Sequence, residues 1–219
     1  MRRSRFLLLP LAIAVLGGAG MPGSVAGAAA HHKTPATKAI VIRPVTAAGK
    51  AASGFQVKKE KGAIDCKYAG PSIGAVDPDI DECSPAAAYA IACWKAAKAH
   101  HTLCTRNPKS HRLYRFPLTS SFKSTAPLKA KQRAPLRLKL TSGTRCDIRI
   151  GGAGAVLEVH PKWSATYYCG AHAVWASPHA NHYGINEKAA SWTVHLGRAD
   201  GTGRLKIRHI AKGYFVGTA

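Results

Sequence analysis

The segment Gly70–Gly74 has the spacing G-x-S-x-G, with Ser72 at its centre. This spacing occurs in serine hydrolases, where a strand precedes the nucleophilic serine and a helix follows it. The residues after Gly74, Ala-Val-Asp-Pro-Asp, are poor helix formers, so we interpret the segment as a turn. A hydrolase that uses Ser72 is therefore an alternative function and not the expected one.

A second group of chemically competent residues is rich in imidazoles. Cys169, His172, His179 and His182 lie within fourteen residues, and neutral imidazoles at such spacing can bind zinc or copper. However, Cys169 is expected in a disulfide, and Ser177–Gly184 has the composition of an exposed, turn-rich loop. We keep His172, His179 and His182 as candidate metal ligands of the hydrolase alternative, and we expect no cofactor.

Asp77, Asp79, Asp81 and Glu82 are four of the ten acidic residues in the chain. Carboxylates at alternate positions are typical of the start of an EF-hand calcium loop. The pattern then fails, because Glu82 stands where glycine is needed and Ala88 stands where the bidentate glutamate belongs. We interpret the segment as a solvated acidic loop.

Cationic side chains are the most abundant candidate binding groups. The chain has 32 Lys and Arg residues against 10 Asp and Glu residues, a formal net charge of +22. If the segments that carry them share a sheet, one face holds a grid of cations, which binds polyanions and releases counterions. The candidate residues of this cationic face lie on the polar side of alternating segments and are Arg137, Lys139, Arg145, Arg149, Lys206 and Arg208.

Residues 1–30 have the organisation of a secretory signal peptide. A start with three arginines precedes the apolar run Phe6–Leu16, and small residues follow up to Ala30. The uncharged stretch is long enough to span a bilayer, so a retained anchor is the alternative to cleavage. We expect cleavage, and hence a secreted or cell-wall-associated monomer without a transmembrane segment.

A composition change divides the remaining chain. Residues 31–61 are rich in Ala, Lys, Thr and Gly, which predicts a basic, disordered tether. Within it, Ala39–Val45 can add a short edge strand. Residues 62–219 are expected to form a single domain, whose size allows a substantial core.

Apolar and polar residues alternate in several segments of this domain. Period-two alternation indicates half-buried antiparallel strands. We therefore predict a mainly β fold: a small antiparallel sheet domain, sandwich or barrel-like, with disulfides. The four tryptophans are interpreted as core residues. The inward-facing sets are Leu136, Leu138 and Leu140; Cys146, Ile148 and Ile150; Trp192, Val194 and Leu196; and Leu205 and Ile207.

The segment Pro85–His101 has two readings. The Ser-Pro pair at its start and its many alanines favour a helix. The alternation of Tyr89, Ile91 and Cys93 favours a strand instead, with Thr102–Thr105 as its hairpin partner.

The six cysteines are expected to form disulfides. An even number of cysteines in an exported chain favours a complete disulfide set, although fifteen pairings are possible. The cysteines are Cys66, Cys83, Cys93, Cys104, Cys146 and Cys169.

A series of short motifs resembles a group of small secreted six-cysteine proteins of actinobacteria. The resemblance runs from Asp81 to the end of the chain and implies a cysteine-rich extracytoplasmic domain with no activity. The chain departs from the group in its much higher basic charge and in Ser142, where aspartate is expected. The motifs are Asp81-Glu-Cys-Ser-Pro, Ala92-Cys-Trp, Leu103-Cys, Ser110-His-Arg-Leu, Gly143-Thr-Arg-Cys, Tyr167-Tyr-Cys-Gly, Ser191-Trp-Thr-Val and Tyr214-Phe-Val-Gly-Thr-Ala.

This resemblance favours the strand reading of Pro85–His101. A hairpin there places Cys93 within about 6 Å of Cys104, which is close enough for a disulfide. For the other cysteines we favour neighbours in sequence, Cys66 with Cys83 and Cys146 with Cys169.

The C-terminus is unusually apolar for the end of an exported chain. Tyr214, Phe215 and Val216 lie within six residues of the last residue. We expect them to form a strand that docks in the sheet.

These features together predict a secreted, non-enzymatic binding protein. Its expected partner is an anionic cell-wall polymer or lipid surface of the cell envelope, bound electrostatically. Nucleic acid, the usual partner of so basic a protein in the cytoplasm, is not expected outside it. The alternatives are the secreted hydrolase described above and a secreted inhibitor or toxin that acts on another protein.

Overall fold

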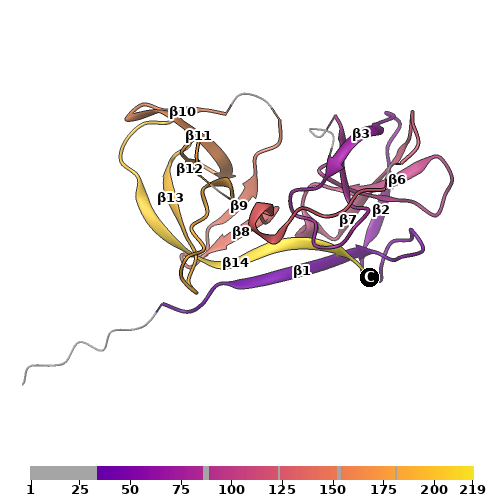
Figure 1. Cartoon of the computed structure of the whole chain (residues 1–219), viewed down its shortest axis with the longest axis horizontal. Helices are drawn as coiled ribbons and strands as arrows, with labels where there is room; N and C mark the ends of the chain where they lie inside the picture. The colour runs from indigo at the N-terminus through magenta and orange to yellow at the C-terminus, as the bar shows by residue number, and fades with distance from the viewer. Residues whose placement is uncertain (1–33, 86–88, 123, 152–153, 181) are drawn as a thin grey trace, which may run out of the picture. The chain divides into compact units, whose positions relative to one another are not determined.

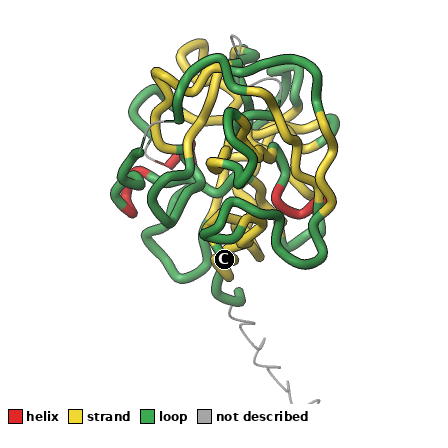
Figure 2. Tube along the Cα trace, turned by 90° about the vertical axis from the view of Figure 1, so that its right-hand side faces the viewer, coloured by secondary structure: helices red, strands yellow, loops and turns green. Residues whose placement is uncertain are grey.

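The computed structural model describes residues 34–85, 89–122, 124–151, 154–180 and 182–219. Strands and loops make up almost all of this part of the chain, with short 3-10 turns as its helical elements (Figure 2). The predicted mainly β fold is therefore confirmed. Within the same ranges no helix has the length and apolar character needed to cross a membrane. The predicted signal peptide lies outside the described residues.

The C-terminal half of the domain forms a closed antiparallel barrel of six strands, which we call the barrel sheet. The strand order is β14-β13-β12-β11-β9-β8, and β8 pairs again with β14 to close the barrel. A short strand, β10 (Val156–Leu157), pairs with β11. The barrel strands are β8 (Arg137–Leu140), β9 (Arg145–Ile148), β11 (His160–Cys169), β12 (His172–Ala176), β13 (Thr193–Arg198) and β14 (Lys206–Thr218).

The preceding half of the domain forms a second sheet, which we call the N-terminal sheet. Its order is β2-β7-β6-β5-β4-β3. A single bridge between Ile64, which precedes β3, and Leu118, which follows β7, links the β3 end of this sheet to its second strand. The strands are β2 (Gln56–Lys59), β3 (Asp65–Pro71), β4 (Asp81–Ser84), β5 (Ala92–Lys95), β6 (His101–Thr105) and β7 (Arg112–Pro117), and the 3-10 turns are η2 (Pro108–Ser110), η3 (Ala130–Gln132) and η4 (His182–Gly184).

A ribbon of two long strands connects the two sheets. Strand β1 (Lys38–Val45) pairs in parallel with β14, and both run beneath the other barrel strands and on toward the N-terminal sheet (Figure 1). At the far end of the ribbon, Trp94 Nε1 donates to Thr218 Oγ1 at 3.2 Å and the Ala219 amide donates to the Val45 carbonyl at 2.8 Å. Residues 34–219 consequently form one compact unit.

The tether predicted over residues 31–61 is therefore wrong for residues 34–61. Ala39–Val45 belongs to β1, as the edge-strand reading expected, and β2 adds a further parallel strand beside β7. Only Pro44 and Val45 of β1 are buried, so the segment has little need of large apolar residues. Main-chain hydrogen bonds to a neighbouring strand hold such an edge strand in place, and composition does not report them.

The predicted alternation on the barrel strands is confirmed for its central members. Leu136, Leu138 and Leu140 are almost wholly buried, as are Ile148 and Val194. Their core is continuous with residues of the N-terminal sheet, including Ile80, Trp94 and Leu113. The apolar C-terminus docks as predicted, with Tyr214, Phe215 and Val216 at most 8 % exposed.

All six cysteines form disulfides with the predicted pairing. These are Cys66–Cys83, Cys93–Cys104 and Cys146–Cys169. Strands β5 and β6 form the predicted antiparallel hairpin, in which Cys93 and Cys104 are direct cross-strand partners. The strand reading of this segment is therefore confirmed for Ala92–Lys95.

Candidate anion-binding surface

A row of four cations crosses four neighbouring strands. Lys38 on β1 pairs with Lys212 on β14, Lys212 pairs with Lys139 on β8, and Lys139 pairs with Arg145 on β9. We call these four residues the cation ladder. Cross-strand partners present their side chains on the same face of a sheet, with Cβ atoms about 4.5–5.5 Å apart in antiparallel pairs.

This arrangement is unfavourable for the protein alone. Like charges directly opposite each other destabilise a sheet by a few tenths of a kcal/mol up to about 1 kcal/mol per pair. Lys38 and Arg145 are exposed, whereas Lys139 and Lys212 are half-buried, so solvent screens the inner pair less well. The ladder thus concentrates positive charge over three strand spacings, or about 14 Å.

A groove of about 400 Å³ lies along three members of the ladder, Lys139, Arg145 and Lys212. In the adjacent row, Tyr214 pairs with Arg137, and the Arg137 Nε lies 3.3 Å from Asp147 Oδ1. From η2, Lys109 Nζ lies 5.6 Å from the centre of the Tyr214 ring, a cation–π contact. The groove is lined by five cations and one tyrosine, without a carboxylate: Lys109, Arg137, Lys139, Arg145, Lys212 and Tyr214.

A bulge in β14 decides which cations share this face. Lys206 and Arg208 pair with Leu196 and Val194, but the register shifts between Ile210 and Lys212. The extra residue reverses the alternation, so Lys212 joins the ladder and Lys206 and Arg208 do not. This register also places Ile207 on the opposite face from Val194, where Ile207 is 62 % exposed. The predicted inward position of Ile207 is therefore wrong.

The single cationic face predicted from the sequence is accordingly divided. Arg137, Lys139 and Arg145 line the groove, whereas Lys206 and Arg208 line a separate cavity of about 260 Å³ together with Arg198 and Arg204. The guanidinium of Arg149 lies close to Gly154. A Cβ atom added to Gly154 would lie 2.7 Å from Arg149 Nη1. Arg149 lines neither cavity.

Sequence reasoning missed three members of the site, Lys38, Lys109 and Lys212. Lys212 stands in the segment that becomes β14, and extending the predicted strand beyond Arg208 could have included it. Lys38 was assigned to the tether, and Lys109 belongs to a 3-10 turn without any alternation. No sequence signal placed these two beside the barrel.

Ser72, the candidate nucleophile of the hydrolase alternative, is not arranged for catalysis. Its side chain is fully buried, and the residues that follow it form a turn whose Ala75 amide donates to the Ser72 carbonyl. The helix that a nucleophile elbow requires is missing from this described segment. The turn interpretation is therefore confirmed for Ile73 and Gly74, whereas Gly70 and Pro71 end β3.

The acidic segment Asp77–Glu82 fixes loops through separate hydrogen bonds. Asp77 pairs with Arg43 and accepts the Thr218 amide at 2.9 Å, while Asp79 accepts the Ser124 hydroxyl at 2.6 Å. Asp81 is completely buried and accepts the Thr125 hydroxyl, so the solvated reading is wrong for this residue. Glu82 is exposed, yet its carboxyl is partly desolvated, which raises its pKa.

The candidate metal ligands whose side chains the structure describes do not meet. His172 lines the cavity beside Arg198, His179 lines a different cavity, and Cys169 is bonded to Cys146. The side chain of His182 lies outside what the structure describes. Among the described residues, no group of three or more His, Cys, Asp or Glu side chains is placed to hold a metal ion.

Comparison with protein-family models, with curated proteins and with solved structures found no match to this chain. The resemblance to secreted six-cysteine proteins stays a prediction from the sequence.

Proposed function

We propose that this protein is an exported binding protein that attaches electrostatically to an anionic polymer of the cell envelope through the cation ladder and its groove. The observation that carries the proposal is the direct cross-strand pairing of Lys38, Lys212, Lys139 and Arg145. Four like charges in one row cost stability unless an anion neutralises them. A polyanion that lies across the strands meets all four.

The disulfides and the N-terminal sequence support an exported location. Three disulfides form and the described residues hold no free cysteine, which indicates an oxidising environment. The signal-peptide pattern of residues 1–30 supports export. In such a compartment, the abundant polyanions are wall polymers and anionic lipid surfaces.

The test is a co-sedimentation assay with purified cell wall over a range of salt concentrations. The logarithm of the affinity should fall linearly with the logarithm of the salt concentration, since each anionic group that is neutralised releases counterions. Replacing Lys139 and Lys212 with Gln should weaken binding and reduce the slope by about 2.

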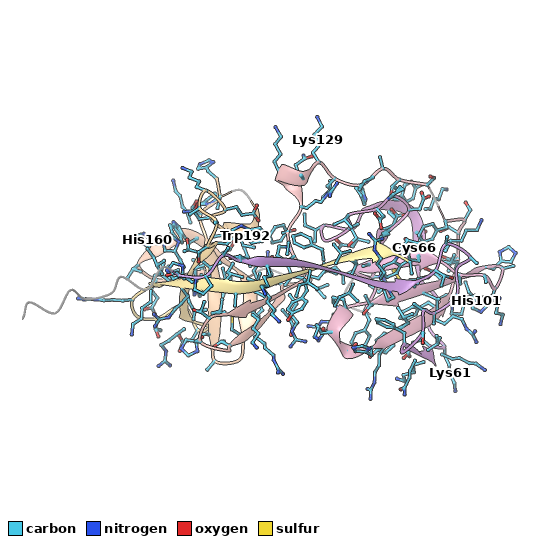
Figure 3. The ribbon with its side chains drawn as sticks, turned by 90° about the horizontal axis from the view of Figure 1, so that it is seen from below. Lys61, Cys66, His101, Lys129, His160 and Trp192 are labelled. Carbon is cyan, nitrogen blue, oxygen red and sulfur yellow. A yellow bond between two sulfur atoms is a disulfide. The ribbon has the colours of Figure 1, made fainter. Side chains whose placement is uncertain are left out.

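A matched control removes the same charge elsewhere. Lys129 and Lys131 are exposed beside η3, and the Lys129 side chain points away from the domain (Figure 3). Replacing both with Gln should leave the slope nearly unchanged. Equal losses in the two double variants would show that net charge alone drives binding and would contradict a role for the ladder. Retention on anionic vesicles but not on cell wall would show that the partner is a lipid surface and not a wall polymer.

A further inference from the structure

A second candidate site lies on the outer face of β11, β12 and β13. Ala165 pairs with Trp175, and Trp175 pairs with His195, so these side chains share one face. Trp163 precedes Ala165 by two residues and points the same way. Trp175 is fully buried as predicted for a core tryptophan, but Trp163 and His195 are only half-buried.

A cavity of about 560 Å³ opens over this aromatic row. Its volume falls in the range of about 300–1,000 Å³ that is typical of small-molecule sites. We call it the Trp163 pocket. The strands contribute Trp163, Trp175 and His195, and the loop between β12 and β13 contributes polar residues at the rim: Ser177, His179, Asn186, Glu187 and Lys188.

The floor of the Trp163 pocket is fixed by contacts within the protein. Trp175 Nε1 donates to the Arg198 carbonyl at 3.2 Å. Gly184 has a φ of +82°, and a Cβ atom there would lie 2.7 Å from the Ala176 Cβ, so only glycine allows this close approach. The pocket is therefore shaped before any ligand enters.

The indole of Trp163 is also held in position. His160 stacks on it with ring centres 5.1 Å apart, and His195 meets it edge-on at 5.3 Å. Figure 3 shows His160 on the barrel side of the molecule, away from His101 and Cys66 of the N-terminal sheet. An oriented aromatic wall of this kind binds ligands at a low cost in conformational entropy.

The lining chemistry selects the class of ligand. Aromatic carbon lies beside an amide, a hydroxyl, imidazoles, one carboxylate and one ammonium group. A purely apolar ligand would strip water from these polar groups without replacing their hydrogen bonds. A polyanion would not be favoured, because the formal charges of Glu187 and Lys188 balance. A saccharide satisfies both halves of the pocket, since its C–H face packs on indole and its hydroxyls exchange hydrogen bonds with the rim.

We propose that the Trp163 pocket is a second binding site, which takes a neutral saccharide. It is independent of the cation ladder, because no residue lines both cavities. The test is titration calorimetry of the secreted protein with two neutral probes, the trimer of N-acetylglucosamine and cellotriose. At least one probe should bind with a Kd of about 1 mM or lower.

Two variants and one change of buffer make the test specific. Trp163→Ala should weaken binding at least about tenfold, and Asn186→Ala, at an exposed rim position, should weaken it by about threefold. The double ladder variant, Lys139→Gln with Lys212→Gln, should bind the saccharide probe with the same Kd as the unmodified protein. Adding about 0.5 M salt should change that Kd by less than about twofold.

The proposal is overturned if neither trimer binds at about 10 mM, or if Trp163→Ala and Asn186→Ala both bind normally. If Trp163→Ala does not fold, the Asn186→Ala result decides alone. Loss of trimer binding in the ladder variant would place the saccharide in the cationic groove and would also overturn a separate pocket.

Discussion

The barrel sheet and the N-terminal sheet differ in how their edges are held. The barrel sheet closes on itself through β8 and β14, the longer of which has 13 residues, and contains one disulfide. The N-terminal sheet has strands of four to seven residues, a single bridge that links its β3 end to β7, and two disulfides. Closure removes unpaired edges through hydrogen bonds, and the smaller sheet depends more on covalent links.

The core around the disulfides shows the same difference. Cys66, Cys83, Cys93 and Cys104 make up most of a small cluster that also contains Ile64 and Phe116. In the barrel, by contrast, Cys146 and Cys169 are two members of a large aliphatic core. A small sheet with little apolar area to bury gains proportionally more from cross-links.

The largest expected effect comes from truncating β14 at its buried C-terminal end. Deleting Tyr214–Ala219 removes most of the β14 residues that pair with β1, together with the Tyr214–Arg137 pair between β14 and β8. Burial of Tyr214, Phe215 and Val216 contributes roughly 1.5–3 kcal/mol each, so the loss approaches a net stability of about 5–15 kcal/mol. We expect little or no folded secreted protein, measured by secretion yield and thermal unfolding.

The paired truncation concerns the N-terminal end of the same ribbon. Deleting residues 31–61 removes β1 and β2, and we expect a comparably severe loss of folded protein. The tether predicted from the composition of this segment would instead leave the melting curve almost unmoved on deletion. A melting curve that is unmoved by this deletion would show that β1 and β2 contribute nothing to stability and would support the predicted tether.

The second prediction compares the disulfides of the two sheets. Replacing all four cysteines of the N-terminal sheet with Ala should cost about 6 kcal/mol, because each closed loop contributes about 3 kcal/mol. Replacing Cys146 and Cys169 should cost about 3 kcal/mol. Denaturant unfolding measures both. If the barrel disulfide proves the more important, the N-terminal sheet does not depend on its cross-links.

Two glycines with similar backbone angles provide the third test. Gly49 follows β1 with a φ of +71°, and a Cβ atom there would lie 2.5 Å from the Ala97 amide nitrogen. Gly143 joins β8 to β9 with a φ of +88°, and a Cβ atom there would meet nothing within 4 Å. Gly143→Ala should cost about 1–2 kcal/mol for the left-handed backbone alone.

Gly49→Ala adds a clash with main-chain atoms of the β5–β6 turn, and it should cost at least about 3 kcal/mol. The difference between the two free energies of unfolding measures how rigidly the segment after β1 is built into the fold. Equal costs would mean that this turn can move away, as a tether would.

The smallest expected effect concerns charge on the barrel. Replacing Lys139 and Lys212 with Gln should raise the free energy of unfolding by a few tenths of a kcal/mol up to about 1 kcal/mol, because direct cross-strand repulsion is relieved. Arg137→Gln should instead lower it slightly, since this residue pairs with Asp147. Thermal unfolding at low salt measures both, and a destabilised double Gln variant would contradict repulsion in the ladder.

The sequence by itself determined the features that depend on near neighbours. The alternation of Leu136, Leu138 and Leu140 predicted a strand because the period of two is a local property of extended backbone. The pairing of Cys93 with Cys104 followed from a hairpin, which the resemblance to six-cysteine proteins favoured over a helix and in which the turn fixes the register. The buried C-terminal strand was foreseen from three adjacent apolar residues.

Only the tertiary structure decided the candidate site. Residues 38, 139, 145 and 212 meet because β1 docks in parallel on β14 and because β8 closes the barrel. Both pairings are non-local, and a parallel edge strand leaves little trace in composition. The bulge between Ile210 and Lys212 is likewise visible only in the tertiary structure. Its one extra residue reverses which side chains of β14 face outward. Local alternation cannot detect that reversal, since the partner strand defines it.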